Sequence, residues 1–91
     1  MSAAFLNRLR VIRACDSFIA QKRMEREKLI ASWMKSKEKG LYYSIAWTAL
    51  ISREVFELRE LALASTDDNI LVDESVFSDI KNYYNDFYKE N

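Results

Sequence analysis

The chain has 91 residues, of which 49% are hydrophobic, and it carries equal numbers of basic and acidic side chains, 14 of each. It contains no histidine, no proline, one glycine and one cysteine. This composition excludes an internal disulfide, argues against intrinsic disorder and hairpin-rich β folds, and removes histidine-dependent catalysis. We therefore expect one folded domain, residues 1–91, in a reducing compartment such as the cytoplasm.

The charges are divided unequally along the chain. Residues 1–40 carry ten Lys or Arg and four Asp or Glu, whereas residues 41–91 carry four and ten. A net +6 segment is thus joined to a net −6 segment, with Gly40 at the boundary. Such asymmetry is typical of chains that bind a charged partner, or whose two halves pack against each other.

The first predicted helix extends from Ala3 to Lys39, because no glycine or proline interrupts it and Gly40 can supply the terminating position. A helix of this length would measure about 54 Å, more than a compact domain of this size can enclose. It must therefore protrude or bend, and Asp16-Ser17 is the expected bend because both residues can cap a helix. Residues 21–28 are too polar for a core and are expected to be solvated.

Targeting signals are weak in this sequence. Residues 1–15 contain three arginines and no acid, a composition also found in amphipathic transit peptides, although we favour a retained helix. The arginines interrupt any apolar region of a secretory signal. The most apolar run, Leu41–Ile51, has eleven residues and is too short to cross a bilayer.

The second predicted helix covers Leu41–Ala64. Its first half is apolar on nearly every side, which is typical of a buried helix, so Trp47 and Leu50 are expected in the core. Its second half is amphipathic. We therefore expect this helix to be the centre of the fold.

The third predicted helix covers Asp73–Lys89, where apolar residues recur at helical spacing. A loop at Ser65–Asn69 precedes it, followed by a short apolar plug or turn at Ile70–Val72. The predicted fold class is all-α: a three-helix assembly with a long N-terminal helix, continuous or bent, and a buried central helix.

A group of aromatic residues near the C-terminus is the first candidate binding site. Its members are Tyr83, Tyr84, Phe87 and Tyr88. Residues at this spacing form either core or interface, since tyrosine can bury its ring and keep its hydroxyl in water. The apolar residues of the third predicted helix form two adjacent lines along it. One line is enough to cover the central helix, so the second line is expected to bind a partner.

A basic row on the first predicted helix is the second candidate site. On a straight helix Arg10, Arg13, Lys28, Lys35 and Lys39 lie within one narrow arc that contains no acid. Such a row can follow nucleic-acid phosphates, although a charged row is more often a solvated face. No zinc-finger spacing, RNA-binding strand motif or helix-turn-helix pattern supports it further.

The residues that most enzymes use are missing. There is no Gly-rich phosphate loop, and the acidic segment 67–74 lacks the order and central glycine of an EF-hand, so no catalytic, cofactor or metal site is predicted. The expected function is that of a non-catalytic accessory or regulatory protein that docks on a larger protein, as an inhibitor or modulator. Two alternatives stay open: direct nucleic-acid binding through the basic row, and a homodimer whose +6 and −6 halves pair.

Overall fold

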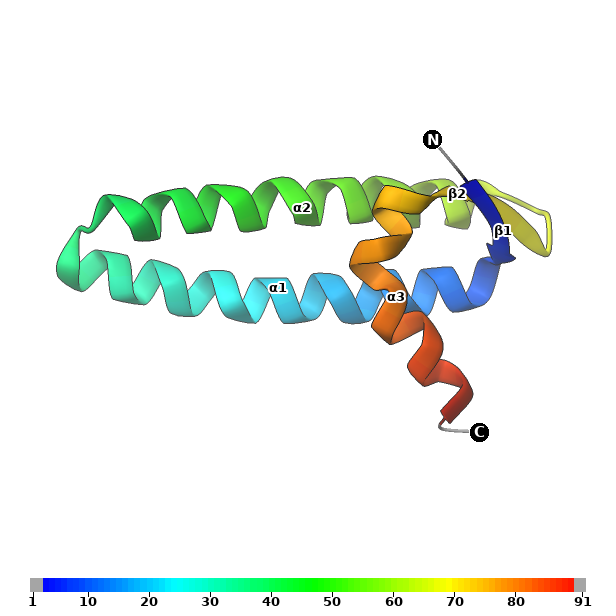
Figure 1. The fold of residues 1–91 in the computed structure, drawn as a ribbon, viewed down its shortest axis with the longest axis horizontal. Coiled ribbons are helices and arrows are strands. Elements are labelled where there is room, and N and C mark those ends of the chain that lie inside the picture. The colour runs from blue at the N-terminus through cyan, green and yellow to red at the C-terminus, as the bar shows by residue number, and fades with distance from the viewer. Residues whose placement is uncertain (1–2, 90–91) are drawn as a thin grey trace.

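The computed structural model describes the backbone of residues 3–89 and the side chains of residues 3–86. The elements follow in the order β1 (Ala3–Asn7), α1 (Arg8–Ser36), α2 (Lys39–Ala64), β2 (Asn69–Asp73) and α3 (Glu74–Lys89). Figure 1 shows α1 and α2 as a long antiparallel hairpin that α3 crosses near the end carrying the strands. We call that end the base and the end with the α1–α2 turn the tip. The three predicted helices are present, in a molecule of 47 × 31 × 21 Å.

α1 is one uninterrupted helix. It begins after Asn7, whose side-chain oxygen accepts a hydrogen bond from the backbone N–H of Arg10 at 3.0 Å. No break occurs at Asp16 and Ser17, so of the two predicted alternatives the helix is continuous and not bent there. The Asp16 carboxylate does not cap a new helix, because it accepts a hydrogen bond from Arg59 of α2 instead. The helix therefore projects beyond the base.

The turn at the tip lies a few residues before its predicted position. α1 ends at Ser36, and Lys37 takes a left-handed conformation (φ 57°) in which its backbone N–H donates to the Trp33 carbonyl at 2.7 Å. Gly40 lies inside the first turn of α2, so its predicted role as the terminating residue is wrong. A left-handed lysine costs roughly 1–2 kcal/mol. This cost is offset in part by the Lys37 ammonium, which lies 4.0 Å from the centroid of the Trp33 ring.

A two-stranded sheet closes the base. β1 pairs antiparallel with β2, so that Ala3 lies opposite Asp73 and Asn7 opposite Asn69. The helix predicted for residues 3–7 and the plug or turn predicted for residues 70–72 are therefore wrong. β2 alternates buried and exposed side chains, which is the period of a strand with one covered face. Its five residues are too few for that pattern to be recognised without the pairing strand.

The core lies at the base, between the three helices and the sheet. Its largest fully buried side chains are Ile80, Val11, Val55, Val72 and Cys15. α1 is the central element, since α3 packs mainly on α1 and only lightly on α2. The expected burial of Trp47 and Leu50 is wrong, because these side chains are 63% and 49% exposed. No element among the described residues 3–89 forms a third layer over them, since α3 crosses only the base.

Cys15 provides a test of this core. Burial, followed by the neighbouring Asp16 charge, raises the pKa of its thiol to about 12, so the reactive thiolate is absent at physiological pH. We expect the native protein to resist iodoacetamide at mildly alkaline pH and the unfolded protein to be alkylated completely. Mass spectrometry with and without guanidinium chloride measures both. Fast labelling of the native chain would contradict the burial of Cys15.

Candidate docking surfaces

The tyrosines predicted to bind a partner belong to the base. Tyr84 is only 8% exposed, and its ring meets Phe77 edge-on with the centroids 5.4 Å apart. Tyr83 is half-buried and packs against α1. The assignment of Tyr84 to a binding surface is therefore wrong, because the ring and hydroxyl are used inside the fold. The side chains of Phe87 and Tyr88 lie outside the described residues.

Tyr84 is buried together with Arg10. The Arg10 guanidinium carbon lies 3.9 Å from the centroid of the Tyr84 ring, and Nη2 donates to the Tyr84 backbone carbonyl. The backbone N–H of Asn7 donates to the Tyr84 hydroxyl at 3.2 Å. These contacts fasten α3 to the beginning of α1. The sequence did hold a signal for Arg10, since it lies four and eight residues before the buried Ala14 and Phe18 and so shares their helix face.

The basic row is shorter than predicted. Arg10 is 5% exposed, and Lys39 belongs to α2, so these two residues are removed from it. The prediction of this row assumed that one helix carries all five residues and that its basic side is fully solvated. In the structure, α3 covers that side of α1 at the base. Arg13, Lys28 and Lys35 are exposed on α1. Phosphate binding by these three stays a prediction.

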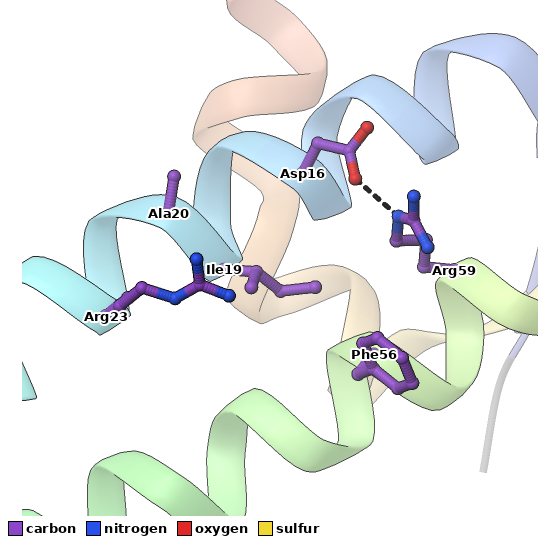
Figure 2. Close-up of a pocket in the computed structure, with 6 residues that line it drawn as sticks. All are labelled: Asp16, Ile19, Ala20, Arg23, Phe56 and Arg59. Carbon is purple, nitrogen blue, oxygen red and sulfur yellow. Dashed lines mark hydrogen bonds and ion pairs between the residues drawn. The ribbon is translucent and has the colours of Figure 1, made fainter.

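A pocket of about 330 Å³ lies between the two long helices. It is lined by Asp16, Ile19, Ala20, Arg23, Phe56 and Arg59, as Figure 2 shows. Arg59 reaches from α2 to α1, with its Nε 2.5 Å from the Asp16 carboxylate, and its Nη1 lies 3.0 Å from Glu60. An exposed pair of this kind adds little stability. Its effect is to align α1 and α2 beside an apolar floor made by Ile19 and Phe56.

The pocket opens on the side of the hairpin away from α3. Arg10 and Phe18 contact α3. At 3.6 residues per turn, Asp16, Ala20 and Arg23 project from the opposite side of α1. We call this side of the hairpin the groove face.

The groove face is lined with apolar side chains along most of its length. Its exposed apolar residues include Ala20, Ile30 and Met34 of α1, and Tyr42, Ala49, Phe56 and Leu63 of α2. The four from α2 are spaced exactly seven residues apart. On a straight helix that spacing drifts by about 20° per heptad, so the four side chains stay on one side of α2, and seven is the period of a seam between helices. Within the described part of the chain, no element packs on this seam.

A second exposed surface lies on another side of α2, near the tip. Tyr43, Trp47 and Leu50 follow one another at i, i+4 and i+7 and are all exposed. We call these three residues the α2 patch. Sequence reasoning placed Trp47 and Leu50 in the core because a helix that is apolar on every side is normally buried. A helix that is apolar on every side is also expected when only one of its sides packs within the chain and the other sides bind a partner.

Folding turns the charge split of the sequence into a polarity along the long axis. Residues 22–54 form the tip half and carry eight Lys or Arg and four Asp or Glu, a net charge of +4. Residues 3–21 and 55–86 form the base half and carry five and nine, a net charge of −4. Acidic partners are therefore favoured at the tip and basic partners at the base.

The described residues hold no group of three or more His, Cys, Asp or Glu side chains that could bind a metal ion. Among the described helices, none has the length and apolarity needed to cross a membrane. The features that stand out are thus two apolar surfaces and a charge polarity, which suit association. The chain matches no protein-family model, no curated protein and no solved structure.

Proposed function

We propose that this chain is a non-catalytic docking protein whose α2 patch binds a larger protein and so inhibits or modulates it. The observation that carries this proposal is the exposure of Tyr43, Trp47 and Leu50 on one side of α2. Tryptophan and tyrosine are the side chains that most often anchor protein interfaces. An exposed apolar cluster has a cost in solubility, and such clusters usually mark a site of contact.

The position of the patch favours recognition by a groove. It lies on a helix that projects away from the core, and its spacing of i, i+4 and i+7 is that of an amphipathic helix seated in an apolar groove. Trp47, the largest side chain of the three, would enter the deepest part of that groove. The rest of the hairpin acts as the rigid arm that presents it.

Charge defines the partner further. The tip half has a net charge of +4, and Lys39 lies one helical turn before Tyr43. A partner whose apolar groove has an acidic rim would therefore be favoured in rate and orientation. The free thiol of Cys15 supports a reducing compartment such as the cytoplasm as the place of this encounter.

The test is affinity purification of the tagged chain from its native cells, with and without nuclease, followed by titration of the recovered partner. We compare the wild type with the double variant Trp47→Ala/Leu50→Ala. The matched control is Leu61→Ala, which truncates another exposed leucine of α2, at the base. We expect a stoichiometric, nuclease-resistant partner for wild type and control, and about a hundredfold weaker binding by the double variant.

Two results would overturn the proposal. Undiminished binding of the partner by the double variant would remove the α2 patch from the interface. Recovery that disappears on nuclease treatment would favour the nucleic-acid alternative, with Arg13, Lys28 and Lys35 as its contacts. Melting temperatures of all variants show whether a loss of binding is a loss of fold.

A further inference from the structure

The groove face has the shape of one half of a helical bundle. The hairpin supplies two antiparallel helices, and four-helix bundles are formed by adding two more on an apolar side. On its α3 side the base is covered by α3, whereas Met34 near the tip and Leu63 near the base, at the two ends of the groove face, are both exposed. Any helical partner seated there must follow the hairpin lengthwise.

We propose that the occupant of the groove face is a second copy of this chain, packed antiparallel to the first. In this arrangement α2 lies along α2 of the second copy, with tip beside base at both ends. The two-fold axis crosses the hairpin between Ala49 and Phe56. The interface is isologous, so each contact occurs twice.

The seam on α2 is complementary in size to the same seam of a second copy that runs in the opposite direction. Reversal about its midpoint places Phe56 opposite Ala49 of the second copy and Tyr42 opposite Leu63 of the second copy. The small alanine thus leaves room for the phenylalanine ring, as interdigitating helices require. A parallel pairing would instead set the two Phe56 rings against each other and leave a gap between the two Ala49 side chains.

Charge selects the same orientation. An antiparallel pair sets the +4 tip half of each copy beside the −4 base half of the other, whereas a parallel pair sets like charges together. Opposite charges across an interface fix its orientation even where they add little affinity.

The available area is sufficient for a stable dimer. The molecule extends 47 Å along its longest axis, which the hairpin follows. Two adjacent helices are about 20 Å wide, so the flat footprint of one side of the hairpin is at most about 900 Å². Stable interfaces bury about 800 Å² per partner. This pairing is separate from the proposed function, because the α2 patch points from another side of α2 and stays exposed in the dimer.

The first test is the mass of the full chain by sedimentation equilibrium over a range of concentrations. We expect a wild-type dimer, and for Phe56→Glu a dissociation constant raised by about tenfold or more, since the new carboxylate would be buried at the seam. Tyr42→Glu is the second disruptive variant. Trp47→Ala/Leu50→Ala is the control that should dimerise as the wild type does. Circular dichroism checks that each variant is folded.

The second test reports orientation. Chains with Tyr42→Cys are mixed with chains carrying Leu63→Cys, and disulfide cross-links are allowed to form. The antiparallel pairing predicts cross-links between the two kinds of chain and few between identical ones, while the buried Cys15 does not compete. A wild type that remains monomeric, a Phe56→Glu chain that dimerises equally well, or efficient cross-linking of either variant with itself would overturn the proposal.

Discussion

Replacing Tyr84 with alanine should lower the free energy of unfolding by about 3–5 kcal/mol, the range for truncating a buried aromatic side chain. Its ring is enclosed by Phe77 and the Arg10 guanidinium, and its hydroxyl accepts the backbone N–H of Asn7. Truncation removes all three contacts at once, because they meet on a single side chain. Urea denaturation followed by circular dichroism measures the loss.

Two companion variants separate the contributions. Tyr84→Phe keeps the ring and removes only the acceptor for Asn7, so we expect a loss of about 1 kcal/mol. Tyr43→Ala truncates an exposed tyrosine of the α2 patch and should change stability by less than about 0.5 kcal/mol. If Tyr84→Ala were as mild as Tyr43→Ala, the base would not be organised around Tyr84.

The second large effect is expected at Ile80, the largest of the fully buried side chains. Ile80→Ala should cost about 2–5 kcal/mol, because the lost transfer free energy is joined by the cost of a cavity. Leu50→Ala removes a side chain of similar size that is already half in water. It should cost about 1 kcal/mol or less. The contrast would place the core at the base and not around the tip half of α2.

Ile80→Val provides the graded control, since loss of one methylene should cost about 0.5–1.5 kcal/mol. Equal losses for Ile80→Ala and Leu50→Ala in a monomeric sample would mean that the tip half of α2 is covered after all. The measurement is therefore made at concentrations below the onset of self-association, where exposed leucines have no partner.

The three helices were predictable because each depends on local information. Apolar spacing marks α3, the absence of glycine and proline marks α1 as a long element, and the apolar run that begins at Leu41 marks α2. Their boundaries were less predictable. Lys37 ends α1 in a conformation that glycine adopts more easily, because the contact of its side chain with Trp33 depends on how the turn is built.

The features that escaped prediction depend on contacts between distant segments. The strand at residues 3–7 exists because β2 lies beside it, and Arg10 is buried because α3 crosses its side of α1. The exposure of Trp47 depends on how far α3 reaches along the hairpin. Apolar composition indicates which side chains avoid water, but not whether this chain or another covers them.

The pairing of β1 with β2 has a consequence for synthesis. The ribosome makes β1 before β2 and α3, the segments that contact it, and Asn7 and Tyr84 are 77 positions apart. α1 and α2 adjoin through a short turn and can associate as soon as both have emerged, whereas closing so long a loop is slow. A nascent chain can therefore hold a formed hairpin with an open base between the synthesis of α2, which ends at Ala64, and that of α3. Release of the C-terminal helix is the event that completes the core.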